Sequence, residues 1–352
     1  MKVICEERTD REIPESMIIS QSDDGWHPLK DPNYVEWWYF DLTNIDGSLV
    51  RGQFYIIGDV SRPNKVKTGV RASLVKPDLT EVLIDKKFPY SSFRSSTEVC
   101  DVEIGGNYLK GDLSHYRLHV EDGGKALDLE FDSEITGFKG RACFGDVRRY
   151  MIWVVPQPRS RVRGTFRTEE ETLDVEGVGY RDHNWSNISP IKCVSYWDWG
   201  RIYANEFTVI FANIVATRRF ENAEVKPLMV YDSRGLIFLT TEAKKWTLTK
   251  SDVKFDLHRR MECPERYSLK AQDKDLFLDI DLGVERVFQE IDLIADYNPL
   301  VRLFTRTFVA DPFAISLLSV GSGRLDFSGQ QNALTCTAIH EFVNNRRQRS
   351  LV

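Results

Sequence analysis

The sequence lacks the patterns that identify secreted, disulfide-stabilised or membrane-spanning proteins. Its six cysteines are scattered and contain no Cys-x-x-Cys pair, which predicts reduced, mostly buried thiols. The first residues contain no apolar stretch of the kind that a secretory signal needs. The most apolar long segment, residues 300–320, is interrupted by Arg302, Arg306, Asp311 and Pro312. We therefore expect a soluble, cytoplasmic protein without a membrane span.

The sequence also contains fewer basic than acidic residues. The 47 Lys and Arg residues are outnumbered by 53 Asp and Glu residues, for a net charge of -6. Nucleic-acid binding depends on basic side chains that neutralise phosphates, so we expect no nucleic-acid partner. Six arginines in residues 148–167 gather around Pro156 and Pro158, and we interpret this stretch as a solvated linker rather than a binding patch.

Signatures of nucleotide, hydrolase and metal chemistry are missing. There is no P-loop and no Gly-x-Ser-x-Gly elbow, and residues 177–179 lack the third glycine of a dinucleotide loop. His115 and His119 are four residues apart, but in a strand they share a face without converging on a metal. Three further histidines have no acidic or cysteine cluster nearby in sequence: His27, His258 and His340. We expect no bound metal and no cofactor.

The sequence is instead rich in aromatic and alternating residues. It contains 20 Phe, 13 Tyr and 8 Trp, which favour strands and line apolar ligand cavities. Apolar residues alternate with acidic ones in residues 127–132 and 276–282. Turn sequences that end in glycine separate such runs, at residues 46–47, 122–124 and 232–235. This pattern predicts an all-β fold of antiparallel sheets.

Few helices are expected. Asn298 as a cap and Pro299 as the first residue predict one short helix, with four apolar residues on one face: Leu300, Leu303, Phe304 and Phe308. Without helical crossovers, a doubly wound parallel sheet is not expected. A chain of 352 residues exceeds one ordinary core, so we expect two connected β-barrel or sandwich domains, residues 1–160 and 161–352. Closed sheets of this kind can enclose a hydrophobic small molecule.

Three segments carry residue types that strands do not need for packing. They are residues 36–41 (Glu-Trp-Trp-Tyr-Phe-Asp), residues 177–185 (Gly-Val-Gly-Tyr-Arg-Asp-His-Asn-Trp) and residues 196–201 (Tyr-Trp-Asp-Trp-Gly-Arg). In the first segment, Glu36 and Trp38 share one face, and Trp37 and Tyr39 the other. A purely structural alternative is that these aromatic strands close the end of a barrel, while Asp182 and His183 hold a loop.

In this order, the three motifs resemble the lipocalin-like family that contains carotenoid 1,2-hydratase and the AttH proteins. The resemblance extends from about Trp26 to Glu341. It implies two connected lipocalin-like β domains around a hydrophobic cavity, in a fold that is related to decalin-forming Diels-Alderases. It also implies cofactor-independent addition of water to a terminal isoprenoid double bond, with an aspartate as the proton donor.

The resemblance assigns roles to residues of this chain. His183 and Trp185 match the His-x-Trp pair of the hydratases, and Tyr196 and Asp198 match their Tyr-x-Asp, although fewer residues separate the two motifs here. Ser186 also stands where a glycine is usual. The expected catalytic residues are Asp198, His183 and Trp185. The expected substrate-binding residues are Glu36, Trp37, Trp38, Tyr39, Tyr180, Asp182, Tyr196, Trp197, Trp199 and Arg201.

Acid catalysis sets requirements that these residues can be tested against. Protonation of an alkene needs a carboxyl that remains protonated near neutral pH, and burial of Asp198 among Tyr196, Trp197 and Trp199 would raise its pKa. Aromatic faces such as those of Trp185 and Trp199 would stabilise the carbocation. A neutral His183 would orient water, because a charged imidazole beside Asp198 would lower the pKa of the carboxyl.

Two other functions remain open. A pericyclase needs only a shaped apolar cavity and a donor to a carbonyl, such as Arg201 or Tyr39. A non-catalytic carrier of a lipophile needs only the cavity. In each case we expect a hydrophobic small-molecule partner, and peripheral membrane contact for substrate access stays open.

Overall fold

The computed structural model describes residues 3–5, 9–10, 15–256, 261–295, 298–306 and 312–345. Strands dominate the described residues, and they pair antiparallel within the two sheets. The chain divides into two compact units. The N-terminal unit comprises Ile13–Cys143 and Val147–Ser189, and the C-terminal unit comprises Met1–Glu12, Phe144–Asp146 and Pro190–Val352. The expected all-β architecture with few short helices is confirmed.

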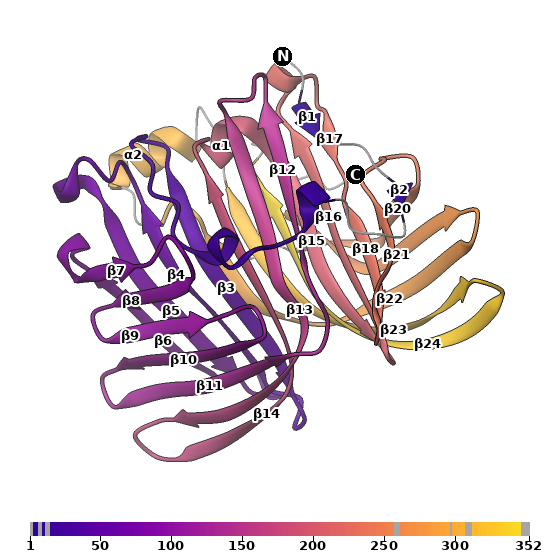
Figure 1. The fold of residues 1–352 in the computed structure, drawn as a ribbon, viewed down its shortest axis with the longest axis horizontal. Coiled ribbons are helices and arrows are strands. Elements are labelled where there is room, and N and C mark those ends of the chain that lie inside the picture. The colour runs from indigo at the N-terminus through magenta and orange to yellow at the C-terminus, as the bar shows by residue number, and fades with distance from the viewer. Residues whose placement is uncertain are drawn as a thin grey trace. The chain divides into compact units, whose positions relative to one another are not determined.

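The N-terminal unit is built on one strongly curved sheet (Figure 1). Its strands pair in the order β6-β5-β4-β3-β14-β13-β11-β10-β9-β8-β7, and β12 pairs with β13. The strands are β3 (Val35–Asn44), β4 (Leu49–Ile57), β5 (Lys67–Val75), β6 (Glu81–Phe88), β7 (Phe93–Ser95), β8 (Cys100–Ile104), β9 (Asn107–Gly111), β10 (His115–Asp122), β11 (Lys125–Ser133), β12 (Phe138–Phe144), β13 (Tyr150–Arg167) and β14 (Thr172–Ser186). Four 3-10 turns complete it: η1 (Glu15–Met17), η2 (Gln21–Asp24), η3 (Pro63–Lys65) and η4 (Tyr90–Ser92).

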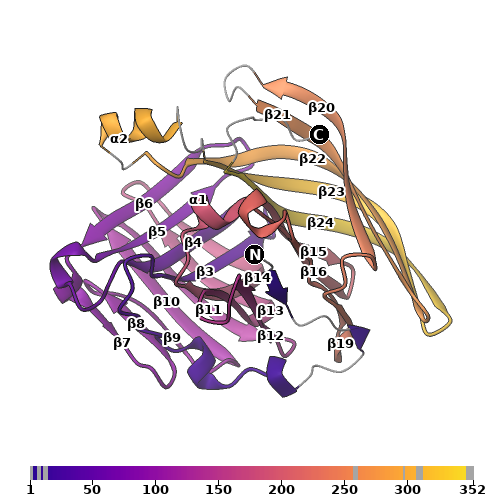
Figure 2. The same ribbon diagram turned by 90° about the horizontal axis from the view of Figure 1, so that it is seen from above.

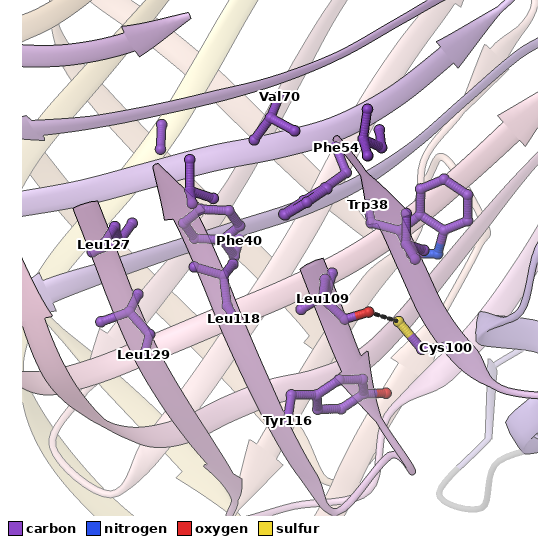
Figure 3. Close-up of a cluster of buried hydrophobic side chains, with 14 of the residues drawn as sticks. Trp38, Phe40, Phe54, Val70, Cys100, Leu109, Tyr116, Leu118, Leu127 and Leu129 are labelled. Carbon is purple, nitrogen blue, oxygen red and sulfur yellow. Dashed lines mark hydrogen bonds between the residues drawn. The ribbon is translucent and has the colours of Figure 1, made fainter. Parts of the chain in front are cut away.

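The sheet of the N-terminal unit curls back on itself. Lys86 on the edge strand β6 forms an ion pair of 2.6 Å with Asp122 on β10, and Lys125 Nζ donates to the carbonyl of Leu83 at 3.1 Å. The inward-facing side chains form one core that includes Trp38, Phe40, Phe54 and Tyr116. Figure 3 shows these rings packed between strands from both ends of the pairing order.

The C-terminal unit is built on a second antiparallel sheet, in which β20 to β24 lie side by side (Figure 2). Its order is β2-β19-β18-β16-β15-β24-β23-β22-β21-β20, and β17 pairs with β16. The strands of this sheet are β2 (Thr9–Asp10), β15 (Val194–Ala204), β16 (Phe207–Ala216), β17 (Glu224–Val225), β18 (Leu228–Asp232), β19 (Gly235–Thr240), β20 (Trp246–Asp256), β21 (Met261–Asp273), β22 (Leu276–Asp292), β23 (Phe313–Phe327) and β24 (Gln330–Asn344). The short strand β1 (Val3–Cys5) is assigned to this unit but is not part of its sheet. Its helical elements are α1 (Pro190–Cys193), η5 (Arg218–Phe220) and α2 (Pro299–Phe304).

The division between the units differs from the expected boundary between residues 160 and 161. That position lies inside β13, which pairs along most of its length with β14. The units meet in sequence at Ser189 and Pro190 instead. The expected linker is therefore a strand. Pro156 and Pro158 fall where the β13–β14 register shifts, at a bulge, which is one of the few positions in a sheet that tolerate a residue without a backbone N–H.

Local patterns agree with the structure in most places. Residues 127–131 lie in β11 and residues 276–282 lie in β22, and in both strands the alternating apolar side chains are buried. Phe277 lies on the opposite face of β22 and is exposed. The glycines of the expected turns have positive φ, as at Gly47 and Gly124. Cys100, Cys143 and Cys336 are buried and carry free thiols.

The expected helix begins as predicted but does not bury its apolar face. The Asn298 side chain accepts a hydrogen bond of 3.0 Å from the backbone N–H of Leu300. Leu300, Leu303 and Phe304 are exposed at 77%, 64% and 59%, and Phe308 lies outside the described residues. Among the described residues, none of the helices has the length and apolar character that a membrane crossing requires.

Candidate functional site

The first two motifs lie on neighbouring strands of the N-terminal unit. In the β3–β14 pairing, Trp38 is opposite His183 and Glu36 is opposite Trp185. Side chains of directly paired residues share a face, so all four point into the unit's interior. Gly177 and Gly179 permit this pairing, because a Cβ at Gly177 would meet the Thr43 carbonyl oxygen at 2.1 Å.

His183 lies between two carboxylates in this interior. Its Nε2 is 2.8 Å from Glu36 Oε1, and its Nδ1 is 3.4 Å from Asp24 Oδ1. All three side chains have no exposed surface. Burial lowers the pKa of His183, but the hydrogen bonds and charges of Asp24 and Glu36 outweigh burial and raise that pKa to about 8. His183 is therefore an imidazolium at neutral pH, whereas a neutral ring was expected beside the proton donor.

The two carboxylates are held as anions by further partners. Burial raises the pKa of Asp24, but the charge of Arg181 and hydrogen bonds from His183 and Tyr116 lower it below its ordinary value. The Tyr116 hydroxyl donates to Asp24 at 2.6 Å, and the Arg181 guanidinium lies 3.7 Å over the Tyr116 ring. Burial likewise raises the pKa of Glu36, and hydrogen bonds from His183 and His27 more than offset it.

Aromatic rings surround the imidazolium. Trp38 stacks on His183 with ring centroids 4.5 Å apart, and Trp185 lies 5.1 Å from it at an angle of 39°. Trp185 also stacks on His27 at 3.6 Å and 4°. No acidic cluster was recognised near His27 in the sequence, and a solvated or core histidine was expected. In the structure, both its backbone N–H and its ring lie against Glu36.

The side chains on the opposite face of β3 and β14 form a second buried polar group. Tyr39 is opposite Asp182, and Trp37 is opposite Asn184. Asp182 accepts hydrogen bonds from Tyr180 at 3.0 Å and Trp153 at 3.2 Å. Burial raises the pKa of Asp182, and the hydrogen bonds from Tyr180 and Trp153 offset only part of this rise. The resulting pKa is about 7. The expected substrate-binding residues therefore divide between the two faces of the sheet.

The third motif lies on β15, in the C-terminal unit. Asp198 is opposite Phe342 on β24 and Asn213 on β16. Lys250 Nζ is 2.7 Å from Asp198 Oδ1 and lies 4.0 Å over the Phe342 ring and 5.6 Å over that of Tyr196. Burial raises the pKa of Asp198, and the charge and hydrogen bond of Lys250 only partly offset that shift.

The surroundings of Asp198 differ from expectation on one point. Trp197, Trp199 and Arg201 have the opposite parity on β15, so their side chains leave the sheet on the other face. Trp197 donates to Glu341 at 3.2 Å, and the Arg201 guanidinium lies 4.2 Å over the Tyr203 ring. The rings that share the face of Asp198 are instead those of Tyr196 and Phe342.

Sequence reasoning missed the residues that complete this cluster. His340 is opposite Gly200, so it lies on the same face as Asp198, and its Nε2 is 2.7 Å from Ser319 Oγ. The Tyr267 ring meets His340 edge-on at 4.5 Å. Burial, together with the charge of Lys250, lowers the pKa of His340 to about 3, so this ring is neutral. His340 and Phe342 are two residues apart on one strand and therefore share a face. This spacing was the one signal in the sequence that could have indicated His340.

The motifs thus form two clusters, one in each unit. His183, Trp185, Glu36 and Trp38 come together in the N-terminal unit. Asp198 and Tyr196 come together with Lys250 in the C-terminal unit. That His183 and Trp185 share one site with Asp198 stays a prediction.

Comparison with known proteins supports the architecture. No protein-family model matches the chain. A hydroxyneurosporene dehydrogenase from Chlorobaculum tepidum is 19% identical over 222 residues, covering 53% of this chain and 58% of the relative. The chain thus spans less than two thirds of the length of that curated relative.

Three solved structures match nearly the whole chain. An AttH-type protein from Nitrosomonas europaea is 12% identical with a TM-score of 0.63 and covers 94% of this chain and 98% of its own. CghA with Sch210972 is 11% identical with a TM-score of 0.62 and covers 95% and 98%. Kievitone hydratase from Nectria haematococca is 15% identical with a TM-score of 0.61 and covers 97% of each chain. The fold is lipocalin-like.

Proposed function

We propose that this protein is a cofactor-independent enzyme that protonates a carbon-carbon double bond of a hydrophobic isoprenoid or polyene, with Asp198 as the proton donor. The observation that carries the proposal is the environment of this carboxyl. It is buried, its pKa is raised, and it lies beside Lys250 where the Phe342 and Tyr196 rings hold a positive charge.

The Asp198 carboxyl can supply the proton. Burial raises its pKa, and the charge and hydrogen bond of Lys250 offset that shift only in part, so the protonated form is more favoured than in an exposed aspartate. Transfer of that proton to an alkene leaves a carboxylate and a carbocation. The rings over which the ammonium now lies can stabilise this cation, by about 0.5–2 kcal/mol each.

The neutral His340 ring suits the second step. An imidazole that is not protonated near pH 7 can accept a proton from water that attacks the cation. Hydration results when water attacks. When an alkene within the substrate attacks instead, a ring closes and a new carbocation forms, which loses a proton to His340 or is trapped by water. The protein returns to its starting state when the proton accepted by His340 passes back to the Asp198 carboxylate.

Comparisons of fold and of sequence support this class of reaction without naming the substrate. Kievitone hydratase is named for a hydration, and hydroxyneurosporene dehydrogenase is named for an isoprenoid. The shared fold also keeps a pericyclase open, with the fully buried Arg201 as the donor to a carbonyl.

A solvent-isotope experiment tests the proposal. The protein is incubated in heavy water with geranylgeraniol, an acyclic isoprenoid probe, and with any apolar molecule that co-purifies, and products are analysed by mass spectrometry. We expect carbon-bound deuterium with the unaltered protein and none with Asp198→Asn. An unlabelled product that Asp198→Asn still forms would favour a pericyclase, and recovery of unchanged ligand in all samples would favour a carrier.

A further inference from the structure

The interior of the N-terminal unit brings together three donor groups that are far apart in sequence. His27 lies between η2 and β3, Glu36 lies on β3, and His183 lies on β14. One ligand atom from each residue lies within 4.8 Å of the other two. Two imidazole nitrogens and one carboxylate oxygen form the donor set that catalytic zinc sites use, with a fourth position for water or a ligand.

The spacing of these atoms suits a small divalent ion. Ligands bound at about 2.0–2.2 Å around a tetrahedral metal lie roughly 3.3–3.5 Å apart. His27 Nδ1 is 3.4 Å from Glu36 Oε1, which matches this spacing. His183 Nε2 is 2.8 Å from the same oxygen and needs to move by only about half an ångström as its proton leaves.

A buried nitrogen gives a second, independent reason. Among the described residues, the buried His27 Nδ1 makes no hydrogen bond of ordinary geometry, and its contact with Glu36 Oε1 is 3.4 Å long. Buried polar atoms almost always have a partner, so this nitrogen calls for an explanation. The His27 ring faces Glu36, and its stacking on Trp185 fixes that orientation.

Neighbouring groups are arranged as they are around metal ligands. Asp24 lies 3.4 Å from His183 Nδ1, on the side away from Glu36, as carboxylates do behind metal-bound histidines. The Tyr34 hydroxyl and the His27 backbone N–H donate to Glu36 Oε2 and orient that carboxylate. The His27 side chain is 26% exposed, which leaves a route for an ion from solvent.

We propose that His27, Glu36 and His183 bind a divalent transition-metal ion of the zinc class. The proposal is independent of the function proposed for Asp198, which lies in the other unit. Binding replaces the proton shared by His183 Nε2 and Glu36 Oε1 with the metal, and that proton passes to solvent. The alternative is a metal-free ion-pair network of Asp24, His183 and Glu36.

Cobalt is a suitable probe because bound Co²⁺ absorbs visible light with an intensity that reports its coordination. Untagged full-length protein is treated with a chelator, dialysed and titrated with Co²⁺, and then with Zn²⁺ as competitor. We expect intense visible bands typical of low coordination number, saturation at one Co²⁺ per chain, and loss of the bands on addition of Zn²⁺.

Two sets of variants locate the ion. His27→Ala removes a partly exposed ligand and is expected to weaken Co²⁺ binding at least about tenfold, and Asp24→Asn by roughly 10- to 100-fold. Circular dichroism establishes that each variant is folded, and His27→Gln serves as a milder second variant. The matched control is His115→Ala with His119→Ala, which removes two histidines that pair with Asp132 and Asp128 on the surface of β10.

Three results would overturn the proposal. The first is the absence of Co²⁺ bands with the unaltered protein, which would leave the ion-pair network. The second is a Co²⁺ affinity in the folded His27→Ala and His27→Gln variants that equals the affinity of the unaltered protein. The third is loss of binding in the His115 and His119 double variant alone, which would place the ion on the surface of β10.

Discussion

Each unit buries a histidine in a polar cluster, and the two clusters move the histidine pKa in opposite directions. His183 in the N-terminal unit has a pKa of about 8, whereas His340 in the C-terminal unit has a pKa of about 3. Both are buried, so desolvation lowers the pKa of both. The difference lies in the partners, because His183 has two carboxylates and His340 has a serine hydroxyl and a nearby ammonium. Burial alone therefore does not predict the charge of a histidine.

The same comparison applies to the carboxyls. Asp24 and Glu36 have lowered pKa values because Arg181, His183 and hydrogen-bond donors outweigh burial. Asp198 has one cationic partner, Lys250, and its pKa is raised. The N-terminal cluster thus holds fixed anions, and the C-terminal cluster holds a carboxyl that can carry a proton. Asp182 in the N-terminal unit also has a raised pKa, so we assign the proton donor to Asp198 because the Phe342 and Tyr196 rings beside it hold the positive charge of Lys250.

The largest expected effect is on turnover. Asp198→Asn nearly preserves shape but removes the transferable proton, so turnover of an isoprenoid substrate should fall by about 10²- to 10⁴-fold, with little loss of binding. Asp279→Asn is the control, because it removes a carboxylate from a partly exposed pair with Lys270 in the same unit. Steady-state kinetics measure both. Equal losses in the two variants would contradict the role of Asp198.

The next effect is on stability of the N-terminal unit. Asp24→Asn removes the buried counter-charge of Arg181 and one of the two carboxylates beside His183, and should cost about 3–5 kcal/mol of unfolding free energy. Asp128→Asn breaks a surface pair with His119, in which Asp128 is 55% exposed, and should cost roughly 0–1 kcal/mol.

Urea denaturation followed by hydrogen exchange of peptides from the N-terminal unit measures this difference, since a chain of two units need not unfold in one step. A cost for Asp24→Asn no greater than that for Asp128→Asn would mean that the buried cluster does not stabilise the fold.

The two histidines should titrate in different pH ranges. The folded pKa of His183 exceeds the unfolded value of about 6.5, so its contribution of roughly 2 kcal/mol is present below pH 6.5 and is lost as pH rises through about 8. The folded pKa of His340 is below the unfolded value, so the native state loses stability as pH falls from about 6.5 toward 3.

Imidazole NMR of chelator-treated protein measures both values directly, and His183→Gln and His340→Gln assign the signals. A single shared pKa near 6.5 for both rings would remove the contrast between the clusters.

The smallest effect distinguishes the two faces of β15. Phe342→Leu removes a ring that lies 4.0 Å from the Lys250 ammonium and should lower turnover by an amount equivalent to about 0.5–2 kcal/mol. Trp199→Phe changes a ring on the opposite face and should leave turnover nearly unchanged. If Trp199→Phe lowers turnover more than Phe342→Leu does, the carbocation forms on the face of β15 that carries the tryptophans.

Much of the local structure could be predicted from the sequence. Alternation of residues 276–282 predicted a strand with one buried face, and Gly47 and Gly124 marked turns that need positive φ. The parity of Glu36 and Trp38 also predicted correctly that they share a face, because side chains of a strand alternate with a period of two. The same rule, applied to Asp198, would have separated it from Trp197 and Trp199.

Tertiary structure alone decided the partners of each charged group. Asp24 reaches His183 and Lys250 reaches Asp198 across many intervening residues, because antiparallel pairing joins strands in an order that local patterns do not encode. The boundary between the two units also could not be predicted from local sequence patterns. Pro156 and Pro158 suggest a linker locally, but a bulge lets β13 continue through them. Composition and periodicity thus determined the strands and their faces, whereas long-range pairing determined which buried groups carry charge.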